Sequence, residues 1–174
     1  LATGPRNQQS MGHNVNTWKK YESMIKSIYD SVSKHNLNLI IKRHPDIAEN
    51  DFSPEFYSEL SDVKIIKNGD LSEFLLDSKI VLSLGTTSAI LESQVLKKPF
   101  ISILVDHDPY GTSEYMSNSC LETTPEKFDK TFSEIITNPD IISKLSQDGN
   151  HSVKESISNL GSSSRILFDI LNKL

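Results

Sequence analysis

The chain has very little cysteine, and this excludes two kinds of stabilising framework. Cys120 is the only cysteine in a sequence of 174 residues. A lone cysteine cannot close an internal disulfide, and it cannot supply the paired thiolates of a structural zinc site. We therefore expect one domain in a reducing compartment, stabilised by a hydrophobic core that a chain of this length can build.

Positive charge is also scarce, and it is not concentrated in a stripe. The chain carries 18 Lys and Arg residues against 23 Asp and Glu residues, which gives a net charge of −5 at pH 7. A nucleic-acid-binding surface needs clustered basic side chains, so we expect no nucleic-acid partner. No apolar run reaches the length of a membrane span, so any association with a membrane would be peripheral.

Three common enzyme motifs are missing. The sequence contains no Gly-x-Gly-x-x-Gly fingerprint, no Walker loop and no Gly-x-Ser-x-Gly elbow. Residues 106–108, Asp-His-Asp, are of types that ligate metals. Neighbouring loop residues rarely point to one centre, however, and no second carboxylate cluster accompanies them. We therefore expect no metal site.

The chain does not begin with methionine. Its first four residues, Leu-Ala-Thr-Gly, are typical of the last half of a strand that runs into a glycine turn. We therefore expect residues 1–174 to form a single domain of a longer protein, with a partner domain on its N-terminal side.

Strands and helices alternate along the chain. Short apolar runs predict strands at residues 39–41, 63–66, 79–83 and 99–104. Periodic apolar residues predict helices at 17–35, 54–60 and 71–77, and a helix that begins after the glycine and hydroxyl residues at 85–88 and ends at about residue 96. Further helices are predicted at 125–137, 139–148 and 153–172, the last interrupted by Gly161. Continuously apolar short strands that alternate with helices are typical of a parallel sheet covered on both faces, with right-handed crossovers. The sequence thus predicts a doubly wound, Rossmann-like α/β fold with a helical C-terminal segment.

One strand-to-helix junction carries most of the functional information. A buried strand ends at Gly85, and Thr86, Thr87 and Ser88 precede a helical pattern. The first amides of a helix lack internal partners and lie at the positive end of its dipole, so they and the hydroxyls can bind a phosphate. Glu92, about one turn further, is placed to accept hydrogen bonds from both hydroxyls of a ribose. In the simpler alternative, Thr87 or Ser88 only caps the helix and Glu92 is solvated.

Further candidate ligands follow other predicted strands. Arg43, His44 and Pro45 follow the second strand, Arg6 lies in a turn after the first, and residues 106–111 follow the fifth. In a doubly wound sheet these ends share one edge, where ligands bind at the point of reversed strand order. His44 can donate a ring N–H to a phosphate or a sugar carboxylate. Arg43 or Lys42 would add positive charge near the leaving phosphate, and Arg6 would reach the same phosphates. A structural His44 and a solvated Arg6 are the alternatives.

These motifs resemble a known family. A strand that ends in Lys-Arg-His-Pro (residues 42–45), and the segment 71–103 that contains the hydroxyl residues, are similar to the C-terminal, nucleotide-binding half of GT-B glycosyltransferases. The order of a His-Pro pair before a Ser/Thr cluster is especially similar to bacterial sialyltransferases, Kdo-type capsule transferases and glycerophosphotransferases. The resemblance covers about residues 38–112, and it implies that residues 1–174 form a single nucleotide-binding α/β domain, the C-terminal half of a longer, two-domain protein.

The resemblance implies roles for particular residues. In the related families the two motifs bind the cytidine nucleotide of the donor, so His44 and Pro45 would fill the His-Pro role and Thr87 and Ser88 the hydroxyl role. Glu92 matches the ribose-binding glutamate of related enzymes. The catalytic base of inverting transferases of this architecture generally comes from the N-terminal half. No catalytic residue is therefore assigned to this chain, and the domain alone is expected to be inactive.

The implied function is nucleotide-sugar binding in a glycosyltransferase of surface polysaccharide or glycolipid assembly. We expect a cytidine nucleotide somewhat more than uridine, a glycan or lipid acceptor, no separate cofactor, and a cytoplasmic location that includes the inner face of the membrane. UDP-N-acetylglucosamine 2-epimerases are similar too, but they have a Ser-Gly-Gly pattern where this chain has Gly-Thr-Thr-Ser. An epimerase and a non-catalytic nucleotide-sugar-binding module remain the alternatives.

Overall fold

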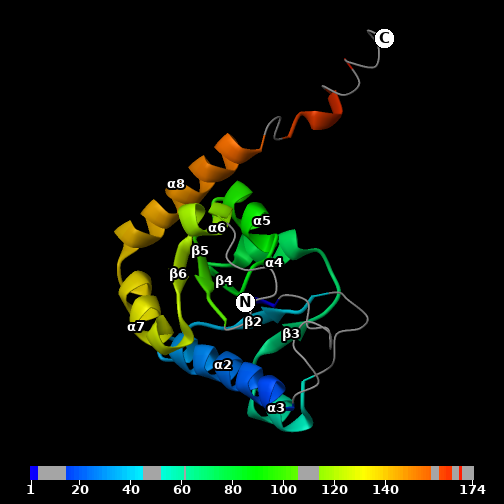
Figure 1. The fold of residues 1–174 in the computed structure, drawn as a ribbon, viewed down its shortest axis with the longest axis vertical. Coiled ribbons are helices and arrows are strands. Elements are labelled where there is room, and N and C mark those ends of the chain that lie inside the picture. Colours follow the sequence, from blue (N-terminus) through cyan, green and yellow to red (C-terminus); the bar gives the residue numbers. More distant parts are fainter. Residues whose placement is uncertain are drawn as a thin grey trace.

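A computed structural model gives the arrangement of the chain. It describes residues 1–3, 15–44, 52–60, 62–105, 114–157, 161–165 and 169. Six parallel strands form one sheet in the order β3-β2-β1-β4-β5-β6 (Figure 1). The strands are β1 (Ala2–Thr3), β2 (Ile40–Lys42), β3 (Lys64–Ile66), β4 (Val81–Leu84), β5 (Phe100–Ile103) and β6 (Leu121–Thr123). This order is that of a doubly wound sheet, and it confirms the predicted fold class.

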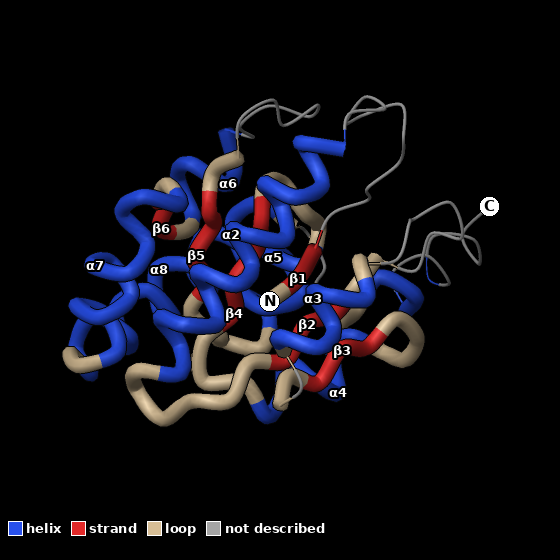
Figure 2. The backbone as a smooth tube through the Cα atoms, turned by 90° about the horizontal axis from the view of Figure 1, so that it is seen from below, coloured by secondary structure: helices blue, strands red, loops and turns tan. Residues whose placement is uncertain are grey.

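Helices connect the strands and cover the sheet (Figure 2). They are α2 (Val15–Ser33), α3 (Pro54–Glu59), α4 (Leu71–Asp77), α5 (Ala89–Val95), α6 (Glu114–Ser119), α7 (Pro125–Ile136) and α8 (Pro139–Ser156). Helices α2 and α7 pack together on one side of the sheet, and α5 packs against α4 and α8 on the other.

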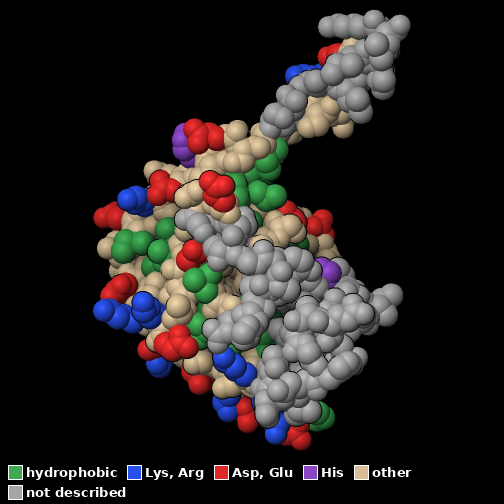
Figure 3. All heavy atoms as spheres, viewed as in Figure 1, with side chains coloured by type: hydrophobic (Ala, Val, Ile, Leu, Met, Phe, Trp, Pro, Cys, Tyr) green, Lys and Arg blue, Asp and Glu red, His purple; other side chains and the backbone are tan. Residues whose placement is uncertain are grey.

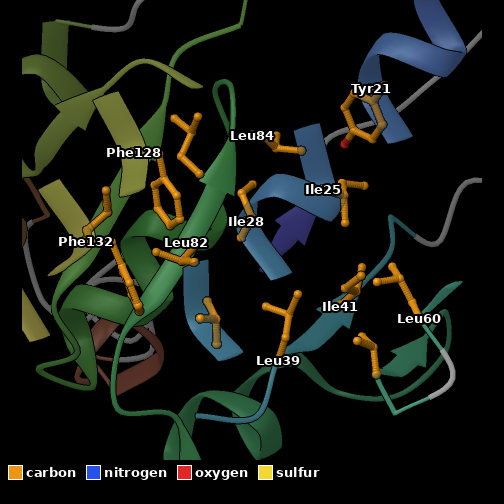
Figure 4. Packing of buried hydrophobic residues seen from close by; sticks show 14 of the residues in the cluster. Tyr21, Ile25, Ile28, Leu39, Ile41, Leu60, Leu82, Leu84, Phe128 and Phe132 are labelled. Atoms are coloured by element: carbon orange, nitrogen blue, oxygen red, sulfur yellow. The ribbon is translucent and has the colours of Figure 1, made fainter. Parts of the chain in front are cut away.

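The two faces of the sheet have separate apolar cores because successive strand side chains point to opposite sides. Leu82 and Leu84 of β4 contribute to the larger core, which α2 and α7 cover with residues such as Ile28 and Phe128 (Figure 4). On the other face Val81 and Phe100 pack with Leu75 of α4 and Ile90 of α5. Full burial of one such side chain stabilises the fold by about 1.5–3 kcal/mol.

The helix predicted at residues 71–77 has these same bounds in the structure, because Asp70 caps it. The Asp70 carboxylate accepts a hydrogen bond from the Ser72 amide at 2.9 Å. The amides at a helix N-terminus lack partners within the helix, so a side-chain acceptor favours a sharp start. The same cap lowers the pKa of Asp70, chiefly through that amide.

The C-terminal region differs from the prediction. Helix α8 is continuous from Pro139 to Ser156, whereas the sequence predicts a break between residues 148 and 153. The expected break coincides with Gly149, a poor helix former by propensity. Gly149 is buried where α8 approaches α5, so tertiary packing overrides its propensity.

Strand β6 and helix α6 were not predicted. Helix α6 has only six residues, and β6 contains Glu122 within three residues. Neither segment has a continuous apolar run or regularly spaced apolar residues, the signals that predicted other short elements such as β2 and α3.

Charged side chains of opposite sign lie next to each other on the described surface (Figure 3). Lys26 of α2 bonds to Glu59 of α3 at 2.6 Å, and Lys34 bonds to Asp129 of α7 at 2.9 Å. None of the described helices is both long and apolar enough to cross a membrane.

Candidate functional site

The carboxyl ends of the strands define the position of the candidate site. Thr3 pairs with Leu84, Leu84 with Ile103, and Lys42 with Ile66, so the strands end along one edge of the sheet. The strand order reverses between β1 and β4. Because β1 separates β2 from β4 and neighbouring strands lie about 4.8 Å apart, the ends of β2 and β4 lie about 10 Å apart. A ligand between them would contact residues that follow both strands.

The end of β4 turns at Gly85, which is buried and has a positive φ of 73°. Its N–H donates to the Ile103 carbonyl at 2.9 Å, and its carbonyl accepts from the Ser83 hydroxyl at 3.0 Å. A side chain at this φ would be strained, so the turn requires glycine. These bonds to β4 and β5 fix where residues 86–88 lie relative to the ends of the strands.

Of the hydroxyl residues after this turn, Thr87 caps the following helix and Ser88 does not. Thr87 accepts a hydrogen bond from the Ala89 amide at 3.3 Å and therefore caps α5, as the simpler interpretation of the sequence holds. Ser88, at the N-cap position, has a helical backbone and makes no side-chain capping bond. Thr86 and Thr87 are half-buried and Ser88 is exposed. Helix α5 has only seven residues, so its dipole is small and the hydroxyls would supply much of any phosphate contact.

Glu92 lies four residues after Ser88, in the first turn of α5, and its side chain is exposed. Residues four apart lie on the same face of a helix. The Glu92 carboxylate and the Ser88 hydroxyl are therefore presented together to the same side of α5. The predicted phosphate and ribose contacts are compatible with this placement and remain predictions.

Of the two candidate residues after β2, His44 is half-buried and Arg43 is buried. His44 is half-buried at the sheet edge, directly beyond the strand. Arg43 is only 4% exposed, and its guanidinium points to helix α3. There it lies 5.4 Å from the centroid of the Phe52 ring, and Nη1 donates to the Tyr57 hydroxyl at 3.4 Å. The Arg43 guanidinium is therefore packed beside the sheet in the α3 region, and its predicted contact with a phosphate remains a prediction.

Other predicted contacts lie outside the described residues. These are Arg6, Pro45 and residues 106–111. Within the described part of the chain, no group of three or more His, Cys, Asp or Glu side chains could hold a metal ion.

A buried polar network behind α5 was not anticipated. Gln94 is 1% exposed, and its amide donates to the Ser119 carbonyl at 2.8 Å while its side-chain oxygen accepts from the Tyr115 hydroxyl at 2.5 Å. The backbone carbonyl of Gln94 accepts from the Asn150 amide at 2.8 Å. These bonds join α5, which carries the candidate ligands, to α6 and α8. A glutamine among the apolar residues of an amphipathic helix was the only sequence signal.

The single thiol is not a candidate nucleophile. Burial, with a smaller contribution from the nearby Glu122 charge, raises the pKa of Cys120 to about 12. A nucleophilic cysteine needs a lowered pKa, because the thiolate is the reactive form.

Comparison with protein-family models gives no match, and comparison with curated proteins gives none. Solved structures do match. HepE from Anabaena, in complex with UDP, has a TM-score of 0.58 at 11% identity, over 99% of this chain and 48% of HepE. The C-terminal domain of the glycosyl transferase LpcC from Francisella tularensis has a TM-score of 0.58 at 12% identity, over 88% of this chain and 83% of that one. A Listeria monocytogenes protein assigned as a UDP-N-acetylglucosamine 2-epimerase has a TM-score of 0.53 at 13% identity, over 87% and 41%.

The chain spans about half the length of HepE. At identities of 11–13%, the structural similarity shows a common fold and nothing beyond it. The chain therefore has the Rossmann-like fold of the C-terminal domain of GT-B glycosyltransferases.

Proposed function

We propose that this domain binds the nucleotide part of a nucleotide-activated sugar for a glycosyltransferase. The observation that carries the proposal is the placement of two polar groups on either side of the reversal point. His44 follows β2, and Thr86, Thr87 and Ser88 follow β4, with β1 between the two strand ends. A ligand in the crevice at the reversal point is the general rule for doubly wound sheets.

The proposed chemistry is displacement of a nucleotide from an activated sugar. The bond between the anomeric carbon and the phosphate oxygen breaks, and its electron pair goes to the phosphate. The acceptor hydroxyl forms the new bond and gives its proton to a base from another domain. Hydroxyl and imidazole donors at this edge would stabilise the charge that develops on the leaving phosphate.

We infer a pyrimidine nucleotide as the ligand. The family resemblance of the His-Pro and hydroxyl motifs favours cytidine, whereas the UDP in HepE supports uridine. Bacterial surface polysaccharide or glycolipid assembly is the proposed setting, on the same resemblance. The Listeria protein supports a second candidate, an epimerase that acts on a UDP-sugar.

Calorimetric titration of the 174-residue chain with CMP, CDP, UMP, UDP and AMP tests nucleotide binding. We expect pyrimidine nucleotides to bind more tightly than AMP. Thr87→Ala and Glu92→Gln should each weaken binding about tenfold, because hydrogen bonds to charged groups are worth about 1.5–3 kcal/mol. Thr137→Ala, an exposed threonine at the end of α7, is the control. Equal or absent binding of all five nucleotides would overturn the proposal.

Transferase and epimerase are separated by products. A protein that contains this domain and its N-terminal partner is incubated with a UDP- or CMP-sugar, with and without an acceptor glycan. A transferase releases the nucleotide in proportion to acceptor, while an epimerase changes the configuration of the sugar without acceptor.

A further inference from the structure

Arg43 is held in place both by its backbone and by its guanidinium. Its backbone N–H donates to the Ile66 carbonyl at 2.8 Å, which continues the pairing of β2 with β3. Its guanidinium lies against the Phe52 ring and bonds to the Tyr57 hydroxyl, and the residue is 96% buried. A planar guanidinium can stack on an aromatic ring and donate in its own plane at once, which an ammonium group cannot do.

The surface that receives this guanidinium is itself anchored to α2. The Ser53 amide and hydroxyl donate to the two carboxylate oxygens of Glu22 at 2.6 and 2.9 Å. The Ser53 hydroxyl also accepts from the Phe56 amide and caps α3. Phe52 and Phe56 lie 4.3 Å apart between ring centroids. Arg43 is therefore attached to a part of the fold whose position is fixed by α2.

The direction of Arg43 constrains the next residue. Ile41 of β2 lies fully buried in the core that contains Phe52 and Phe56. Side chains two apart in an extended strand share a face, so Arg43 points to the same side as Ile41. His44 precedes a proline, which favours extended backbone, so we expect its side chain to point to the opposite side.

We propose that Arg43 is a positioning residue for His44. Its guanidinium, seated between Phe52 and Tyr57, holds the end of β2 so that the imidazole of the following residue faces the crevice at the reversal point. The value of this position for ligand binding rests on the proposed function, in which His44 contacts the phosphate. In this role Arg43 does not bind the phosphate itself, because its guanidinium contacts Phe52 and Tyr57 beside α3.

The test uses two variants that change the residues in contact with the Arg43 guanidinium, called the seat variants, and one variant that changes Arg43 itself. Tyr57→Phe removes the hydrogen bond, Phe52→Leu removes the ring, and Arg43→Lys keeps the charge without the planar group. Tyr29→Phe, in a half-buried tyrosine of α2, is the matched control. Two quantities are measured on the 174-residue chain: the affinity for UDP and CMP by calorimetry, and the ring signals of His44 by NMR with ¹⁵N-labelled histidine.

We expect Arg43→Lys and Phe52→Leu to weaken nucleotide binding about fivefold or more, and Tyr57→Phe about twofold, since the hydrogen bond is long. All three should shift the His44 ring signals in the nucleotide-free protein, and Tyr29→Phe should not. Melting curves identify variants that fail to fold, and Tyr57→Phe, the mildest change, keeps the test decisive.

Other outcomes have distinct meanings. If Arg43→Lys weakens binding while both seat variants bind as the wild type with unshifted His44 signals, Arg43 is a phosphate ligand and the positioning role is wrong. If no nucleotide binds the wild type, the proposed function fails. The His44 signals in the nucleotide-free variants then still decide whether Arg43 orients this side chain.

Discussion

The ends of β2 and β4, which lie on opposite sides of the reversal point, are held by different kinds of group. At the end of β4, Gly85 is fixed by hydrogen bonds to the Ile103 carbonyl and the Ser83 hydroxyl, and its backbone sets the turn. At the end of β2, the Arg43 guanidinium and the aromatic residues of the α3 region set the geometry. One half of the candidate site is therefore defined by backbone and the other by side chains.

The side chains that pack around β4 and β5 also differ from those that pack around β2. Behind β4 and β5 small buried polar residues, Ser83, Ser93 and Ser102, lie among the apolar side chains of the core, and α8 approaches α5 closely at Gly149. Behind β2 the contacts are made by large rings and long charged side chains. We infer that the β4 side is sensitive to added bulk or changed φ, and that the β2 side is sensitive to loss of single side chains.

The largest expected effect concerns the thiol in the closely packed half. With its pKa at about 12, Cys120 has a thiolate fraction at pH 8 about a thousandfold below that of an ordinary thiol, whose pKa lies near 9. Alkylation by iodoacetamide at pH 8 should therefore be slower in the folded chain than in urea, by up to about that factor, because a thiolate of higher pKa is also the stronger nucleophile. A comparable rate in both states would show that this half is open to water.

The same shift predicts the direction of a pH effect on stability. Because the folded pKa of Cys120 is raised, its contribution to stability is fully present below pH 9 and is lost as the pH rises from 9 towards 12. The urea midpoint of the wild type should therefore be lower at pH 10.5 than at pH 8. The difference between the two midpoints should be smaller for Cys120→Ala.

The next effect is steric. A Cβ at Gly149 would lie 2.9 Å from Cγ of Gln94, whose amide is held by buried hydrogen bonds. Gly149→Leu should lower the free energy of unfolding by about 2 kcal/mol, since overpacking costs about 3 kcal/mol at the upper end and better helix propensity returns somewhat under 1 kcal/mol. Gln147→Leu, exposed on the same helix, is the control for propensity. Equal denaturation midpoints for the two variants would contradict close packing of α5 and α8.

A truncation on the β2 side should have a smaller effect. Glu22→Ala removes the acceptor of two hydrogen bonds from Ser53 and should lower the free energy of unfolding by about 1.5 kcal/mol. Glu59→Ala breaks the exposed pair with Lys26 between the same two helices and should leave the denaturation midpoint unchanged. If both variants lose stability equally, anchoring of α3 does not depend on Ser53.

The smallest effect is at the turn. Gly85→Ala places a Cβ at a φ of 73° and should cost about 1 kcal/mol of stability. Gly161→Ala, at a φ of 75° with open space around it, is the matched control for conformational strain. UDP and CMP affinity should fall in Gly85→Ala alone. Unchanged affinity would separate the turn from the ligand site.

Local patterns in the sequence carried much of the fold. The helix at residues 71–77 and the strands β4 and β5 were predictable, because a cap, a continuous apolar run and a proline boundary are each local. The break expected near Gly149 was wrong because the residue is stabilised by a neighbour that lies 55 positions earlier in the chain. Helix α6 has no regularly spaced apolar residues, so no local pattern predicts it.

The site could be predicted only in outline. The sequence by itself determined the alternation of strands and helices and the segments that follow each strand, because hydrophobic periodicity and turn chemistry act over a few residues. Only the tertiary structure decided that β1 lies between β2 and β4, that Arg43 turns to α3, and that Gln94 joins three helices. Those facts depend on strand order and on contacts between distant residues, which no local pattern encodes.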